Sequence, residues 1–132
     1  MSAADDFRAA VESRNFQAGF DLLADDVEFH SPAVHRPYVG KDTVGGLLSI
    51  VAETFENFRY TDELHAEDDT HALIFRAEVA GKELEGIDLL RLGDDGKIAD
   101  FTVMIRPASG LMALASVLGP KVEAAGLKPA GG

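Results

Sequence analysis

The sequence contains no cysteine among its 132 residues. A disulfide framework, thiol chemistry and a cysteine-ligated zinc site are therefore excluded. Basic residues are few, with 12 Lys and Arg against 23 Asp and Glu, which gives a formal net charge of -11. Because so acidic a surface repels phosphate backbones and anionic bilayers, we expect neither nucleic acid nor a membrane as a partner.

Long hydrophobic runs are also missing, and no stretch approaches the roughly 20 apolar residues that span a bilayer. The first residues, MSAADD, lack the basic start and apolar run of a secretion signal, so we expect a cytoplasmic protein. Hydrophobic residues make up 46% of the chain, which is enough for a core of its own. We predict a single domain over residues 1–126 and a flexible C-terminal tail over residues 127–132.

Helical spacing of apolar residues marks the first part of the chain. Ser2 and Asp5 are placed to cap a first helix, and Asn15 is placed to cap a second. The same spacing predicts a long helix over residues 41–55. The pair GG at positions 45 and 46 weakens that helix, so we expect a neighbour to approach its backbone closely.

The spacing then changes to the alternation that is typical of strands. The expected extended segments are residues 27–32, 58–67, 71–79, 83–92 and 98–106. Short turns join the later segments, so they predict an antiparallel, strongly curved sheet. A last helix is expected to begin at Ser109 and to end at Gly119 and Pro120.

One residue does not fit its face of a predicted strand. Asp88 shares that face with Leu84, Gly86, Leu90 and Leu92, which makes it the only polar side chain there. A carboxyl group among apolar walls loses hydration, which raises its pKa and lets it act as an acid, a base or a hydrogen-bond donor near neutral pH. The structural alternative is that Asp88 forms an ion pair with Arg76 or Arg106, or caps a local backbone group.

The element order and four segments resemble the nuclear transport factor 2-like superfamily, in particular its SnoaL-like and ketosteroid isomerase-like branches. The segments are LADDVEFHSP (residues 23–32), YVGKD (38–42), GIDLLRL (86–92) and DGKI (95–98). The resemblance covers nearly the whole chain. It implies an α+β, cystatin-like cone, in which a curved antiparallel sheet wraps around a long helix and leaves an apolar pocket. It also implies a homodimer formed through the sheet.

The resemblance implies roles for single residues as well. Asp88 matches the aspartate that, in the isomerase branch, donates a hydrogen bond to the oxygen of the substrate. Ser31 stands where that branch has its proton-shuttling aspartate, and Phe7 where it has a tyrosine. Because neither Ser31 nor Phe7 can perform those roles, steroid isomerisation by the familiar route is not expected.

Other side chains are candidates for the pocket. His30 and His35 flank the vacant base position, and imidazole titrates near neutrality, so either can move a proton. We interpret His30 as the catalytic candidate beside Asp88. The expected ligand-binding residues are Ser31, His35, Tyr38, Phe55, Phe101, Val103, Ile105 and Arg106, together with Met112 on a helix that either covers the mouth or contacts a partner. Arg106 alternatively neutralises acidic neighbours.

The sequence predicts neither a metal site nor a cofactor. His30, His35, His65 and His71 lack a metal-binding spacing such as His-x-x-x-His on a helix. No glycine-rich phosphate loop is present, so no nucleotide cofactor is expected.

Two hypotheses for the function remain open. The first is a cofactor-free isomerase, cyclase or lyase, either ketosteroid isomerase-like or polyketide cyclase-like, in which Asp88 polarises a carbonyl or hydroxyl group and His30 moves the proton. The second is a non-catalytic ligand-binding or dimerisation module for a small apolar molecule, in which Asp88 anchors a polar tip. The first requires a second titratable group opposite Asp88.

Overall fold

The computed structural model describes residues 2–131. Met1 and Gly132, the outer ends of the predicted domain and tail, lie outside the described residues. The elements are α1 (Ala3–Glu12), α2 (Phe16–Asp21), β1 (Leu23–His30), β2 (Tyr38–Val39), α3 (Lys41–Thr54), β3 (Glu56–His65), β4 (Thr70–Val79), β5 (Lys82–Leu92), β6 (Ile98–Arg106) and α4 (Ala108–Ala124). No helix within residues 2–131 is long and apolar enough to cross a bilayer.

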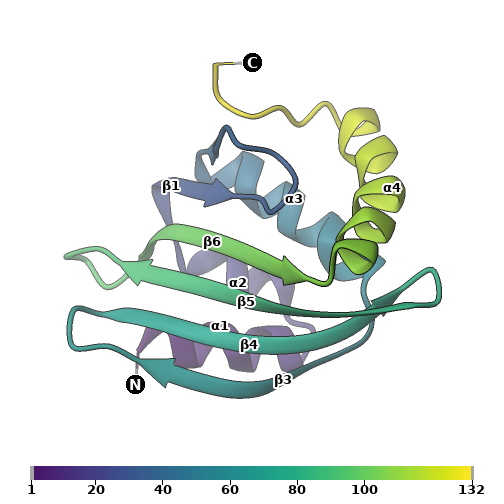
Figure 1. Ribbon diagram of the computed structural model, residues 1–132. Coiled ribbons are helices and arrows are strands. Elements are labelled where there is room, and N and C mark those ends of the chain that lie inside the picture. Colours follow the sequence, from purple (N-terminus) through teal and green to yellow (C-terminus); the bar gives the residue numbers. More distant parts are fainter. Residues whose placement is uncertain (1, 132) are drawn as a thin grey trace.

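The strands form one curved, six-stranded sheet in the order β2-β1-β6-β5-β4-β3 (Figure 1). Strands β3 to β6 follow one another as antiparallel neighbours, as predicted. The pairing of β1 with β6 is parallel, however, so the sheet is not antiparallel throughout. Since more than sixty residues separate these two strands, no hairpin dictates their relative direction.

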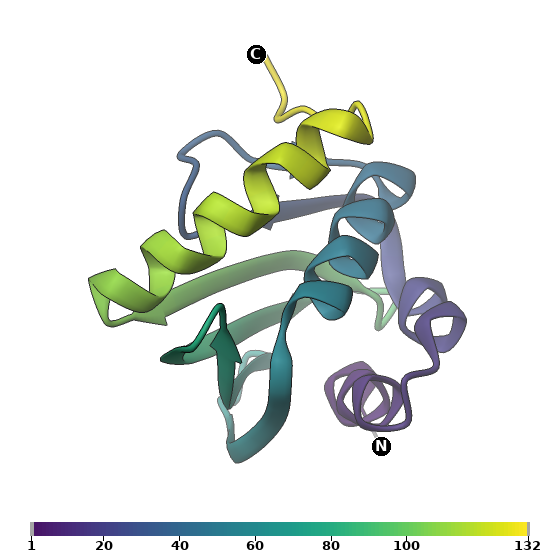
Figure 2. The ribbon, with the colours of Figure 1, turned by 90° about the vertical axis from the view of Figure 1, so that its right-hand side faces the viewer.

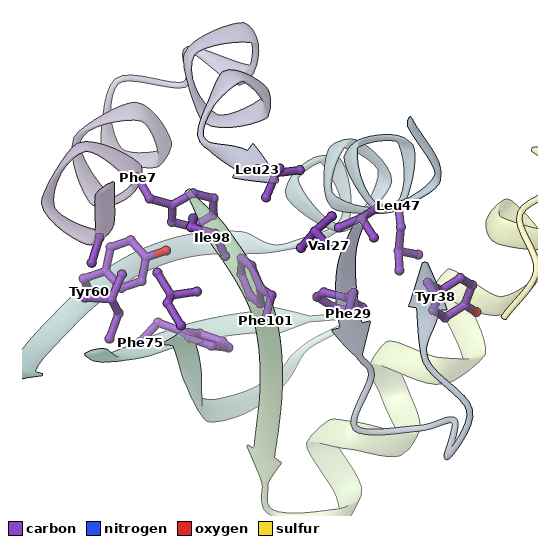
Figure 3. Packing of buried hydrophobic residues seen from close by; sticks show 14 of the residues in the cluster. Phe7, Leu23, Val27, Phe29, Tyr38, Leu47, Tyr60, Phe75, Ile98 and Phe101 are labelled. Carbon is purple, nitrogen blue, oxygen red and sulfur yellow. The ribbon is translucent and has the colours of Figure 1, made fainter. Parts of the chain in front are cut away.

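The helices α1, α2 and α3 lie on one side of the sheet, and α4 crosses the sheet where it contacts β4, β5 and β6 (Figure 2). Alternating residues of β4 and β5 point toward these helices, so the concave face of the sheet is apolar there. Its largest fully buried side chains include Phe75 on β4 and Phe101 on β6. In Figure 3, Phe7 on α1 lies beside Phe101, and the two ring centroids are 5.3 Å apart. The fold is therefore the predicted α+β cone.

The C-terminal end of the chain differs from the prediction where α4 ends, and the tail after it contacts the rest of the protein. Helix α4 continues past Gly119 and Pro120 to Ala124, because Val122 still packs against the core beyond the proline. The tail contacts the body of the protein. Leu127 packs against the core, and the amide of Ala130 donates to the carbonyl oxygen of Pro37 at 2.8 Å.

The close approach predicted at the glycine pair comes from a neighbouring helix. A Cβ atom on Gly45 would lie 2.5 Å from the ring of Phe20 on α2. Gly46 has more space, since the nearest atom to its added Cβ belongs to Leu127 at 3.6 Å. Gly45 thus permits α2 and α3 to pack closely.

Candidate functional site

The cone encloses a cavity of about 1070 Å³ between the concave face of the sheet and the helices. This volume slightly exceeds the usual range for sites that hold small organic molecules, roughly 300–1,000 Å³. Aromatic rings dominate part of its wall, where Phe58 stacks on Phe75 with ring centroids 5.0 Å apart. The cavity therefore suits a mostly apolar ligand.

Asp88 lies in this apolar wall. The alternation of β5 turns it toward the helices, between Leu73 on β4 and Val103 on β6, and leaves it only 7% exposed. Its Oδ2 accepts a hydrogen bond of 2.9 Å from the hydroxyl of Tyr60, which is itself buried. Within residues 2–131 this is the only hydrogen bond to the Asp88 side chain, so Oδ1 has no protein partner.

Burial decides the protonation of Asp88. Loss of hydration raises the pKa of Asp88 from 3.8 to about 7, although the hydrogen bond from Tyr60 acts in the opposite direction. The pKa of Tyr60 is raised well above its usual range, first by burial and then by the charge of Asp88. Tyr60 therefore stays a neutral donor, whereas Asp88 changes charge near neutral pH.

A neutral Asp88 has a defined chemical capacity. Its Oδ2 can accept from Tyr60 while a proton on Oδ1 is donated to an oxygen of a ligand in the cavity. Such a donor polarises a carbonyl group, and it is strongest where apolar walls exclude water. The site thus combines an apolar cavity with one buried carboxyl group that can form a hydrogen bond to a ligand.

The structure places most of the predicted ligand-binding residues around this cavity. Those that line it are Ser31, Tyr38, Phe55, Phe101, Val103 and Ile105. Ser31 follows the end of β1, Phe55 caps α3, and the residues of β6 come from its inward face. In Figure 3, Tyr38 and Tyr60 lie at opposite ends of the labelled cluster.

Four other predicted residues are not among the described residues that line the cavity: His30, His35, Arg106 and Met112. His30 is adjacent to the inward-facing Phe29, and its Nε2 lies 3.0 Å from Oδ2 of Asp100. Met112 is 66% exposed on α4. The structure therefore does not bring His30 together with Asp88.

The proposed ion pair of Asp88 with an arginine does not form. Arg76 and Arg106 both bind Glu85, at 3.2 Å each, on the opposite face of the sheet. Glu85 and Asp88 are three positions apart on β5, so their side chains point to opposite sides. Asp88 is left with Tyr60 alone.

Tyr60 is the site residue that the sequence analysis missed. It lies on β3, two strands away from Asp88, and reaches it across β4. The register aligns Tyr60 with Phe75, and Phe75 with Gly86. The inward alternation of β3 was the only signal available, and a bulge between Tyr60 and Asp62 breaks that alternation.

Other ionisable side chains around the cavity lie on exposed parts of the chain. They are Glu12, Arg14, Asp42, Arg59, Glu123 and Lys128. Beside these, Tyr38 is buried on β2. Within residues 2–131, no histidine lines the cavity.

Comparison with known proteins agrees with this architecture. The model of the SnoaL-like domain matches residues 4–101. No curated protein matches the chain.

Three solved structures illustrate the similarity. A steroid delta-isomerase from Pseudomonas aeruginosa is 37% identical, with a TM-score of 0.88 over 93% of this chain and 90% of that one. An uncharacterised protein with a cystatin-like fold from Silicibacter pomeroyi is 30% identical, with a TM-score of 0.86 over 92% and 85%. A Mycobacterium tuberculosis protein in complex with estradiol-17beta-hemisuccinate is 18% identical, with a TM-score of 0.62 over 80% and 95%, and shares the fold.

Proposed function

The chain belongs to the SnoaL-like domain family, and from this premise we propose that it binds a small, mostly apolar molecule through a carbonyl or hydroxyl group at Asp88. The observation that carries the proposal is a buried carboxyl group in the wall of a large apolar cavity, with one oxygen lacking a protein partner. A hydrogen bond to a ligand satisfies that oxygen, whereas an empty site leaves it in apolar surroundings.

The similarity to a steroid delta-isomerase suggests the first probes. A steroid ketone offers an oxygen to Asp88, and its deoxygenated analogue has the same carbon skeleton without that oxygen. Because a hydrogen bond between neutral groups contributes about 1 kcal/mol, the wild type should prefer the ketone by about fivefold to tenfold. Asp88→Leu should remove this preference, because leucine cannot donate.

The measurement is isothermal titration calorimetry at pH 6, where Asp88 is protonated. Met112→Leu is the matched control, because Met112 is exposed outside the cavity, and it should preserve the preference. Equal affinity of the wild type for ketone and analogue would refute the anchoring role of Asp88. Failure of both probes to bind at their solubility limit would refute this ligand class.

Acid-base catalysis is the second candidate, because one observation favours it. The pKa of Asp88 is raised to about 7, which suits a group that both accepts and donates a proton. In this alternative, the ionised Asp88 takes a proton from the carbon next to a carbonyl and returns it to another carbon. The net result is an isomerisation, or with an internal electrophile a cyclisation, that needs no cofactor.

Binding is the better supported function, because within residues 2–131 the only buried ionisable side chains that line the cavity besides Asp88 are the tyrosines Tyr38 and Tyr60. Deuterium exchange at the carbon next to the carbonyl of a bound ketone separates the two candidates. Exchange that Asp88→Asn abolishes would establish catalysis. Exchange in both proteins at the rate of the ketone alone in buffer would leave binding as the function.

We also propose that two copies pair through the outer face of the sheet. This face carries the partly exposed apolar side chains of Ile74, Ile87 and Leu89, and Met104 beside them is 51% exposed. A shallow depression there is lined by apolar residues and by the ion pair of Glu85 with Arg106. Contiguous apolar surface of this kind is typical of interfaces between subunits.

Light scattering coupled to size exclusion tests the pairing. Met104→Asp should give a monomer, because it places a charge in the centre of the apolar face. Met112→Asp, at a methionine on α4 that is 66% exposed, should leave the dimer intact. A wild type that is monomeric at concentrations of tens of micromolar would overturn the proposal.

A further inference from the structure

We propose a site for a divalent transition-metal ion, of which Zn²⁺ is the representative, between the first turn of α1 and the turn end of the β3-β4 hairpin. Its ligands are Asp5, Glu63 and His65. Each offers one ligand atom, and the three atoms lie within 4.8 Å of one another. None of these residues lines the cavity, so the site is separate from the one that contains Asp88.

The fold assembles this cluster from segments that the sequence keeps apart. The hairpin pairs Glu63 with Leu73 and His65 with His71, so alternation places Glu63, His65 and His71 on the same, helix-facing side of the sheet. The capping box of α1 holds Asp5 above them, since its Oδ2 accepts from the amide and the hydroxyl of Ser2. Two strands and one helix thus converge on one point.

The arrangement of two histidines supports a metal site. Nε2 of His65 lies 2.8 Å from Oε2 of Glu63, and Nδ1 of His65 faces Nδ1 of His71. Metal-binding histidines commonly use one ring nitrogen for the ion and donate the N–H of the other to a buried partner. His65 is oriented in that way, with Nε2 toward the carboxylates and His71 as its partner.

His71 provides the independent observation. It is only 6% exposed, on the inward face of β4, and its Nε2 is shielded from solvent and has no hydrogen-bond partner. A buried ring nitrogen without a partner costs stability, so a histidine at this position requires an explanation. We assign to His71 the role of holding the ring of His65 through its other nitrogen, which makes His71 a positioning residue.

Charge also favours a cation at this point. Asp5 and Glu63 bring two carboxyl groups to one place, since one ligand atom of each lies within 4.8 Å of the other and of a ring nitrogen of His65. Arg8 compensates part of this charge, because its Nη1 lies 3.1 Å from Oε1 of Glu63. Arg8 contacts Oε1 of Glu63, whereas Oε2 is directed at His65, so a metal ion can bind at Oε2 without displacing Arg8.

The ligand set selects the kind of ion. One imidazole and two carboxylates match zinc, which binds nitrogen and oxygen at about 2.0–2.2 Å and leaves its fourth position to water. Magnesium prefers oxygen ligands in an octahedron and is a poor match for an imidazole. The side chain of His65 is 42% exposed, so an ion can enter from the solvent.

Calorimetric titration of the full chain with ZnCl₂, after removal of metals with a chelator, tests the site. The wild type should bind one Zn²⁺ per chain, and the His35→Asn control should bind it equally, because His35 is exposed elsewhere. His65→Asn should lose at least a factor of ten in affinity. His71→Asn should lose a factor of about 10 to 100, the range for a residue that orients a ligand.

A second measurement covers the case in which a variant fails to fold. In the wild type, one equivalent of Zn²⁺ should shift the imidazole NMR signals of His65 and His71 and leave those of His30 and His35 unchanged. Mg²⁺ should shift none of the four. Absence of stoichiometric Zn²⁺ binding to the wild type, or wild-type affinity in a folded His65→Asn, would overturn the proposal.

Discussion

Replacement of Asp88 by asparagine should stabilise the protein at alkaline pH and do so less at acidic pH. The physical reason is the cost of ionising a carboxyl group in apolar surroundings. Asparagine has nearly the same shape and can still accept the hydrogen bond from Tyr60, but it never ionises. The substitution therefore isolates the ionisation of Asp88 from its packing.

The size of the effect follows from the raised pKa. The pKa of Asp88 is 3.8 in the unfolded chain and about 7 in the folded one. Between these values only the folded protein keeps the proton, so its free energy of unfolding falls by about 1.4 kcal/mol for each pH unit as the pH rises. This destabilisation is absent below the lower pKa and complete above the upper one. From pH 5 to pH 8, the wild type should lose about 3 kcal/mol relative to Asp88→Asn.

Urea unfolding of both proteins at pH 5, 6, 7 and 8 measures this difference. The other ionisable groups contribute equally to the free energy of unfolding of both proteins at each pH, so their contributions cancel in the difference. Asp94→Asn makes the same chemical change at an exposed turn, so its difference from the wild type should be nearly independent of pH. A constant difference between the wild type and Asp88→Asn across this range would refute the argument that Asp88 is protonated when folded.

Two further substitutions test the packing and the site. Gly45→Ala should be about 2 kcal/mol less stable than Gly46→Ala in thermal unfolding, because only the methyl group at position 45 meets the ring of Phe20. Equal stabilities of the two variants would contradict the packing of α2 on α3. Tyr60→Phe should raise the pKa of Asp88 above that of the wild type, because it removes a hydrogen bond that favours the carboxylate. A ¹³C NMR titration of the Asp88 carboxyl carbon measures that pKa. A lower or unchanged value would contradict the hydrogen bond from Tyr60 to Asp88.

Local sequence patterns predicted most of the elements, because short-range chemistry determines them. The capping box of Ser2 and Asp5 is confirmed, and Oδ1 of Asn15 accepts from the amide of Ala18 at 3.1 Å to begin α2. Strand β6 has the predicted bounds. The parallel pairing of β1 with β6 escaped prediction, since it depends on contacts between distant segments.

The candidate site was only partly predictable for the same reason. Alternation along β5 was sufficient to predict that Asp88 points inward, because the orientation of a side chain depends only on its position in its own strand. Its partner Tyr60 depends on the register of three strands and on a bulge. The pairing of His65 with His71 is also a matter of register, so their spacing along the chain gave no indication of it.

Infrared difference spectroscopy between the wild type and Asp88→Asn is the most direct test of the central claim, that a neutral carboxyl group faces the cavity. At pH 5.5 the difference spectrum should contain the carbonyl stretch of a protonated carboxylic acid. At pH 8.5 the bands of a carboxylate should replace it, since the pKa of Asp88 is about 7. Carboxylate bands at both pH values would contradict the claim.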